Sequence, residues 1–107
     1  MNEEMETICF QIISYAGDAK SCYMEAIQEA KQNNFEQAGL RIQEGDKSFA
    51  QGHHVHAELI RRKCSGESVP VGLVLIHAED QMMSAEMTKM MAEEWIDWYR
   101  NQEEERV

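Results

Sequence analysis

Residues 3–32 read EEMETICFQIISYAGDAKSCYMEAIQEAKQ, and the spacing of their side chains predicts the architecture of the chain. Apolar and small residues recur three and four positions apart, as on one face of an α-helix. This face consists of Met5, Ile8, Cys9, Ile12, Tyr15, Ala16, Ala19, Cys22, Tyr23, Ala26, Ile27 and Ala30. Gly17 costs only about 1 kcal/mol relative to alanine, and the face stays in phase across it. One helix over about residues 3–32 is therefore predicted.

A second helix is predicted over about residues 34–63. Asn33 and Asn34 end the first pattern, and Asn34 forms a capping-box-like pair with Gln37 before the next apolar residues. The apolar face of this helix also carries small residues, which would let a neighbouring backbone come close. These are Ala38, Gly45 and Gly52.

A third helix is predicted over about residues 70–101, after a break at 65–68 (Ser-Gly-Glu-Ser). Pro70 is tolerated in a first helical turn because no intrahelical hydrogen bond is lost there. Apolar residues occur on every side of this helix, and such a helix is usually buried on every side. We therefore expect it to meet other subunits.

The composition supports an all-α fold with a single domain over residues 1–107. Hydrophobic residues make up 43% of the chain, and only one proline and six glycines interrupt it. Three helices of about 45 Å joined by short turns should pack as an antiparallel three-helix bundle. Because each subunit would leave one apolar face uncovered, we expect an oligomer.

Charge and cysteine content narrow the functional classes. The net charge is −10, with 20 acidic and 10 basic residues, which argues against a nucleic-acid partner and an anionic membrane surface. The longest apolar run, residues 71–76, is too short to cross a bilayer, and the N-terminus does not read as a signal peptide. Three dispersed cysteines read as reduced thiols. The expected location is the cytoplasm, without membrane insertion.

A polar stripe lies in the middle of the third predicted helix. His77, Asp80, Gln81 and Ser84 are spaced so that they share one helical face. Burial of the Asp80 carboxylate would be costly without a partner. The partner could be a cation, hydrogen-bond donors, or symmetry copies of Asp80 around a metal.

These residues belong to a longer pattern that resembles a known family. Residues 7–99 are similar to the IIA component of the lactose/cellobiose (chitobiose) class of the bacterial phosphoenolpyruvate-dependent sugar phosphotransferase system. The most specific part is His77-Ala78-Glu79-Asp80-Gln81-Met82-Met83-Ser84. The other matching segments are Ala16-Gly17-Asp18-Ala19-Lys20-Ser21, Glu25-Ala26, Phe35-Glu36-Gln37-Ala38, Ala50 with His53, Leu59-Ile60 and Ser65-Gly66-Glu67.

The resemblance implies a fold, a mechanism and partners. Members of this family form three-helix subunits that assemble as homotrimers. The resemblance assigns His77 as the histidine that accepts a phosphoryl group from the phosphocarrier HPr and passes it to a cysteine of the IIB component. It assigns Asp80 to a divalent metal ion on the trimer axis, for which magnesium would suit oxygen ligands.

Further residues are candidates for assisting the transfer. A neutral imidazole is available near neutral pH, and catalysis of phosphoryl transfer consists mostly of positioning and charge stabilisation. Gln81 is the nearest hydrogen-bond donor, while His53 and His56 could face His77 across a subunit interface. Family members usually have Gln where this chain has Glu79, and a second His where it has Gln81, which leaves transfer rate and partner choice open.

Several alternatives remain at this point. The cluster His53-His54-Val55-His56, in which His53 and His56 share a face, could bind a transition metal, although no ligand set at zinc-like spacing completes it. Residues 82–91, rich in methionine, could form a partner groove rather than core, and Cys64 lacks the context of a nucleophile. The alternative to the carrier is a trimeric helical interaction or regulatory module without transfer activity. The sugar is not distinguishable.

Overall fold

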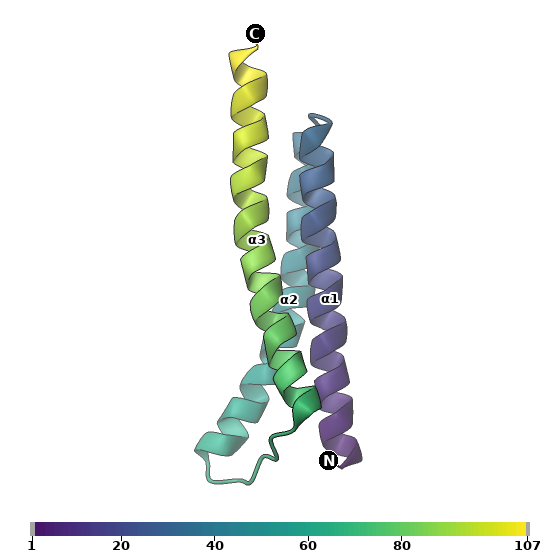
Figure 1. Cartoon of the computed structure of the whole chain (residues 1–107), viewed down its shortest axis with the longest axis vertical. Helices are drawn as coiled ribbons and strands as arrows, with labels where there is room; N and C mark the ends of the chain where they lie inside the picture. Colours follow the sequence, from purple (N-terminus) through teal and green to yellow (C-terminus); the bar gives the residue numbers. More distant parts are fainter. Residues whose placement is uncertain (1, 107) are drawn as a thin grey trace.

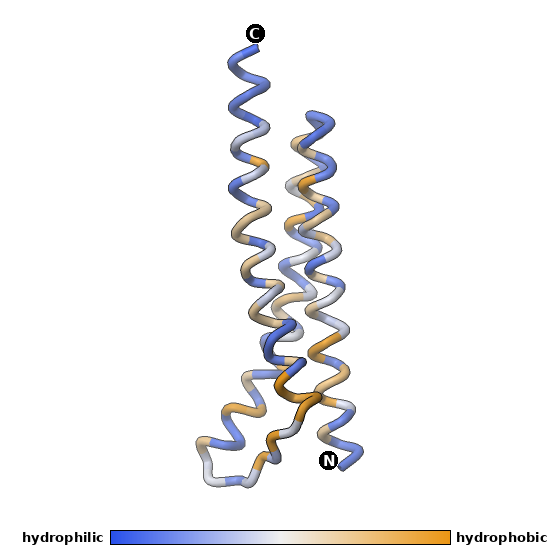
Figure 2. Tube along the Cα trace, viewed as in Figure 1, coloured by the Kyte–Doolittle hydropathy of each residue, from blue (hydrophilic) through white to orange (hydrophobic). Residues whose placement is uncertain are grey.

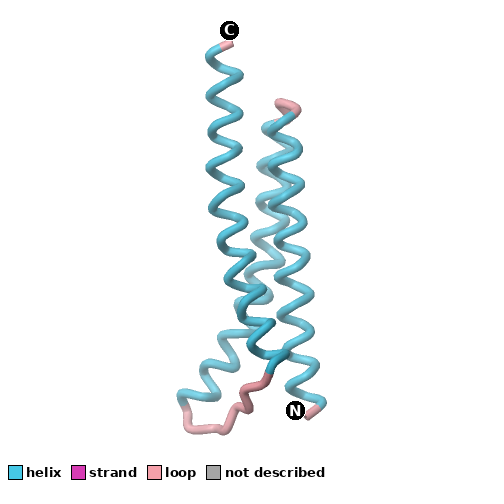
Figure 3. Tube along the Cα trace, in the orientation of Figure 1, coloured by secondary structure: helices cyan, strands magenta, loops and turns pink. Residues whose placement is uncertain are grey.

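The computed structural model of the protein describes residues 2–106 and consists of three long helices, with no strand among these residues. Met1 and Val107, the first and last residues of the predicted domain, lie outside this range. The all-α prediction is confirmed (Figures 1 and 3). The subunit measures 59 × 21 × 19 Å. The helices are α1 (Glu3–Lys31), α2 (Phe35–Cys64) and α3 (Leu73–Glu105).

The turn between α1 and α2 is made by an asparagine in the left-handed region. Asn33 has φ 63°, a conformation that asparagine tolerates better than most residues. The amide of Asn34 donates to the Glu29 carbonyl at 2.9 Å, and the Asn33 amide donates to the Ala30 carbonyl at 3.0 Å. These two bonds form a Schellman motif, which satisfies carbonyls at the end of α1 and reverses the chain.

The predicted capping box at the start of α2 is wrong in its hydrogen bonding. Asn34 is the N-cap residue, but its side chain makes no capping hydrogen bond, so the pair with Gln37 does not act as a box. A side-chain cap forms instead on α1, where Asn2 Oδ1 accepts a hydrogen bond from the Met5 amide at 2.8 Å. An N-cap side chain of this kind satisfies an amide that has no partner within the helix.

The third helix begins three residues later than the sequence predicted. Gly66, at φ 90°, ends α2 in a second Schellman turn. The chain then runs without helix or strand through residues 67–72, where Val69 packs against the core. Pro70 therefore lies outside the helix, which starts after Gly72 and extends to Glu105 rather than about residue 101. The strongly hydrophobic segment at the start of α3 gives way directly to a hydrophilic one (Figure 2).

Tyr23 joins the three helices in the middle of the bundle. Its side chain is fully buried, and its ring lies against Gly45 of α2, where a Cβ would come within 2.6 Å of a ring carbon. Its hydroxyl donates to Asp46 Oδ1 at 2.7 Å, and Lys89 Nζ of α3 lies 2.9 Å from the same oxygen. The predicted close approach at the small residues of α2 is thus confirmed, and it fixes the axial position of the helices relative to one another.

A smaller cluster closes the other end of the bundle. Phe35, at the start of α2, packs near Ile96 and Tyr99 of α3. The Arg100 guanidinium lies 5.3 Å from the centre of the Phe35 ring. Beyond this contact α3 projects past the turn between α1 and α2 (Figure 1).

Candidate functional site

His77 lies on the exposed side of α3, near the beginning of the helix. The inward face of this part of α3 consists of Leu75, Ala78 and Met82, which are 4%, 0% and 6% exposed. Helical geometry turns His77 away from that face, and its ring makes no hydrogen bond with another residue in the range 2–106. The imidazole of a single subunit is therefore open to solvent.

The polar stripe continues from His77 along α3, and α1 contributes a cation to it. Lys20 Nζ donates to Gln81 Oε1 at 2.7 Å and lies 3.4 Å from Ser84 Oγ. Both α3 residues are partly buried, as is Lys20. The predicted shared face of His77, Gln81 and Ser84 is consistent with these contacts, since one lysine reaches two of its members.

Asp80 is exposed in the single subunit, so the burial that its apolar neighbours suggest would require other subunits and stays a prediction. Within residues 2–106 its carboxylate has neither an ion pair nor a hydrogen bond. It lies in a row of exposed residues that alternate three and four positions apart along α3, as in a coiled-coil seam. The apolar members and their exposed fractions are Leu73 (83%), Ile76 (56%), Met83 (70%), Met87 (57%) and Met90 (55%). We call these five residues and Asp80 the outer seam.

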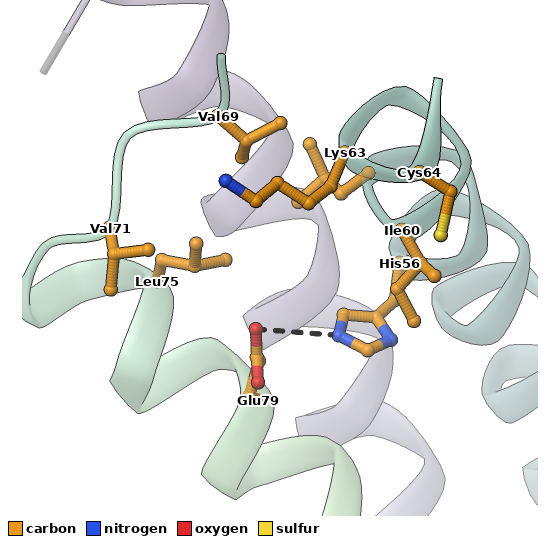
Figure 4. Close-up of a pocket in the computed structure, with 9 residues that line it drawn as sticks. His56, Ile60, Lys63, Cys64, Val69, Val71, Leu75 and Glu79 are labelled. Atoms are coloured by element: carbon orange, nitrogen blue, oxygen red, sulfur yellow. Dashed lines mark ion pairs between the residues drawn. The ribbon is translucent and has the colours of Figure 1, made fainter. Parts of the chain in front are cut away.

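Glu79 points away from the outer seam and toward α2. Its Oε1 lies 3.6 Å from His56 Nε2, across a pocket of about 200 Å³ between the end of α2 and the start of α3 (Figure 4). The pocket is otherwise mainly apolar, with Leu59, Val69 and Leu75 among its lining residues. The Glu79 carboxylate is thus directed toward His56 rather than toward the ring of His77.

His53 and His56 do not act as a pair. His56 is turned inward to Glu79, whereas His53 stays exposed and stacks on Phe49 with ring centres 6.3 Å apart. In the described part of the chain no three His, Cys, Asp or Glu side chains come together as metal ligands. A metal at Asp80 would therefore need ligands beyond these side chains of residues 2–106.

Lys20 is the site residue whose role the sequence did not reveal. It appeared only as part of a matching segment in the first helix, 61 residues before Gln81. Its position next to the apolar face of α1 could have marked it as a residue at the edge of the core. Which residues of α3 it would face depends on the relative height of the two helices.

The remaining titratable groups of the core are the thiols of Cys9 and Cys22. Burial is the main cause that raises the pKa of both, with nearby carboxylates adding to it. Cys64 is exposed at the end of α2. The two buried thiols thus behave as small packing residues, as their positions on the apolar face of α1 predict.

Fold and site together define a class of all-helical proteins that present a histidine on the exposed side of a three-helix subunit. Residues 7–100 match the family described as "PTS system, Lactose/Cellobiose specific IIA subunit". The chain belongs to this family of phosphotransferase system components, which confirms the resemblance noted in its sequence. No helix in the described residues is long and apolar enough to span a bilayer.

Individual relatives agree over nearly the whole chain. The lichenan-specific phosphotransferase enzyme IIA component of Bacillus subtilis (strain 168) is 41% identical, covering 99% of this chain and 96% of that protein. The lactose-specific EIIA component of Staphylococcus aureus (strain N315) is 26% identical, covering 92% and 95%. The crystal structure of the cellobiose-specific enzyme IIA from Bacillus anthracis superposes with a TM-score of 0.93 at 37% identity, covering 96% and 94%.

Proposed function

We propose that this IIA component is a cytoplasmic phosphoryl carrier whose His77 accepts a phosphoryl group from phospho-HPr and passes it to a cysteine of the IIB component. The observation that carries the proposal is the exposed His77 imidazole at the head of a polar stripe on α3. A carrier must meet two protein partners in turn, so its reactive atom has to lie on the surface of the subunit.

Both transfer steps can be written with balanced bonds and protons, and no further reactant is needed. A lone pair of one His77 ring nitrogen attacks the phosphorus atom of the HPr phosphohistidine, whose other ring nitrogen carries a proton. The new N–P bond forms as the N–P bond to HPr breaks, and HPr leaves as a neutral imidazole. His77 keeps its own N–H proton. In the second step a IIB thiolate attacks phosphorus, and His77 is released as the neutral imidazole.

The role of the protein in these steps is positioning and charge stabilisation. Gln81 lies one helical turn after His77 and leans toward it, because side chains in a helix tilt toward its N-terminus. We propose that its amide group donates to the phosphoryl oxygens. The carboxylate of Glu79 is turned to His56, so its negative charge, which would repel the phosphoryl group, is directed away from His77 within the subunit.

We further propose that the outer seam is the contact surface of a homotrimer. Its alternating three-and-four spacing is that of helices packed along a common axis, and its large exposed apolar residues would lose their contact with water there. Neighbouring subunits would then border the site at His77. We assign His53 of such a neighbour as a further donor near the phosphoryl group.

Asp80 fits a divalent metal ion on the axis of such a trimer. It is exposed, has no partner among residues 2–106, and sits in an otherwise apolar row, so its symmetry copies would repel one another without a cation. Three carboxylates supply oxygen ligands, which magnesium prefers. The metal would stabilise the assembly beside the site.

Incubation with phosphoenolpyruvate, enzyme I and HPr, followed by intact mass measurement, tests the carrier function. We expect the added mass of one phosphoryl group, lost on acid treatment and absent in His77→Ala. Gln81→Ala should be phosphorylated more slowly but to the same extent. A wild-type chain that gains no mass would contradict the proposal and favour the alternative, a trimeric interaction or regulatory module without transfer activity. Glu79 and Gln81, where this chain departs from the usual residues of the family, would then support that alternative.

The axial metal has its own test. Asp80→Leu should still assemble as a trimer in sedimentation equilibrium, because leucine continues the apolar seam. Elemental analysis of the purified variant should find no bound divalent metal, whereas the wild type should hold one ion per trimer. Retention of the metal in Asp80→Leu would refute the assignment.

The transported sugar is proposed only as a class. The names of the relatives specify lichenan, lactose and cellobiose, which are all β-linked. We propose uptake of a β-linked disaccharide or short oligosaccharide. The IIA component contacts proteins rather than sugar, so a growth test of a deletion strain on each sugar would decide among them.

A further inference from the structure

Lys20 is unusual among the partly buried cations of this chain. Four of these cations occur in residues 2–106, and the other three each meet a carboxylate. The three paired residues are Arg41 with Glu44 at 3.0 Å, Arg62 with Glu4 at 2.6 Å and Lys89 with Asp46 at 2.9 Å. Within residues 2–106, the Lys20 ammonium contacts only the neutral oxygens of Gln81 and Ser84. A partly buried ammonium without a counter-ion, in a chain of net charge −10, is suited to receive an anion.

The contact also fixes the orientation of the Gln81 amide. An ammonium group has three donors and no acceptor, so it can bind the carboxamide only through oxygen. With Oε1 held by Lys20 at 2.7 Å, the amide nitrogen and its two protons must point elsewhere. Gln81 and His77 share one face of α3, and the free N–H groups therefore belong to the stripe on which the phosphoryl group would reside.

We propose that Lys20 is a positioning residue for phosphoryl transfer: its ammonium holds Gln81 by the oxygen so that the amide donates to the phosphoryl oxygens on His77. This inference rests on the proposed function of His77. Without Lys20 the carboxamide is free to rotate, and in one of its two orientations it presents an oxygen to the anionic phosphoryl group. The ammonium also adds positive charge one turn from His77, on the stripe that carries the Asp80 carboxylate.

The test compares Lys20→Met with Lys47→Met in rapid-mixing phosphorylation by phospho-HPr. Lys47 is exposed on α2, so its variant matches the loss of one positive charge. We expect the maximal rate for Lys20→Met to fall about 10- to 100-fold, less than the roughly 100- to 1,000-fold cost of losing a direct donor to a transition-state oxyanion, because Lys20 acts through Gln81. The HPr concentration for half-maximal rate should change little. Lys47→Met should keep the wild-type rate, and Lys20→Arg should recover most of it.

A double-mutant cycle separates positioning from a general electrostatic effect. If Lys20 acts through Gln81, Lys20→Met should cost much less in a Gln81→Ala background than in the wild type. Equal costs in both backgrounds would overturn the proposal, as would a wild-type rate for a folded Lys20→Met. Circular dichroism and thermal unfolding of each variant report whether it is folded.

A measurement on the unmutated chain keeps the proposal testable even if Lys20→Met does not fold. The side-chain amide resonances of Gln81, assigned by Gln81→Ala, should shift when His77 is phosphorylated. Unchanged resonances would overturn the role of Lys20. A wild-type chain that takes up no phosphoryl group would instead refute the proposed function itself, so the two failures are distinguishable.

Discussion

The contact between Gly45 and Tyr23 makes a sharp test of the packing, through Gly45→Ala. A Cβ at this position would lie 2.6, 2.9 and 3.0 Å from three ring carbons of Tyr23. The ring cannot move aside freely, because it is fully buried and its hydroxyl donates a hydrogen bond to Asp46. The substitution should therefore strain the core where α1 and α2 touch.

The magnitude follows from three contributions. Alanine gains about 1 kcal/mol over glycine in helix propensity. Overpacking of a core costs about 1–3 kcal/mol, and displacement of the Tyr23 hydroxyl from Asp46 costs about 1 kcal/mol more. The net loss in free energy of unfolding should be about 1–3 kcal/mol.

The matched control is Gly39→Ala in the same helix. A Cβ at Gly39 would meet nothing within 4 Å, so the propensity gain should appear alone as a stabilisation of up to about 1 kcal/mol. Urea unfolding followed by circular dichroism, at one fixed protein concentration, measures both variants. In a Tyr23→Leu background Gly45→Ala should lose its cost. Equal stability of Gly45→Ala and Gly39→Ala would refute the reasoning.

Three further outcomes follow from the structure. Native protein should react with one equivalent of a thiol reagent, at exposed Cys64, and with three after unfolding, because Cys9 and Cys22 are buried. Burial raises the pKa of Cys9, Cys22 and Tyr23, so the folded chain keeps protons that the unfolded chain loses above about pH 9, and the free energy of unfolding should decline as the pH rises above that value. Asn33→Ala should cost about 1 kcal/mol because alanine disfavours φ 63°, whereas Asn33→Gly should be neutral or stabilising, as thermal unfolding would report.

The periodic segments were predictable because helix formation is mainly a local matter. The inward face of α1 includes Met5, Cys9, Ile12, Ala16 and Ala19, all of which the spacing of apolar residues had placed there. The ends of α1 and α2 were also predictable from the sequence, since Asn33 and Gly66 are residue types that suit positive φ.

The errors lie where a local signal competed with packing. Pro70 is compatible with a first helical turn, yet Val69 packs on the core and residues 67–72 are not helical, which delays α3 to Leu73. The burial of Asp80 stays a prediction, because it depends on neighbouring subunits. A single subunit covers only the face of α3 that meets α1 and α2.

The sequence by itself determined the three helices, their ends to within a few residues and the shared face of His77 and Gln81, because these depend on spacing within one helix. Only the tertiary structure decided which cation stands beside that face. The contact between Lys20 and Gln81 joins residues 61 positions apart. It exists because α1 and α3 are held at one relative height by packing and hydrogen bonds such as those around Tyr23, and no periodicity within a single helix encodes that height.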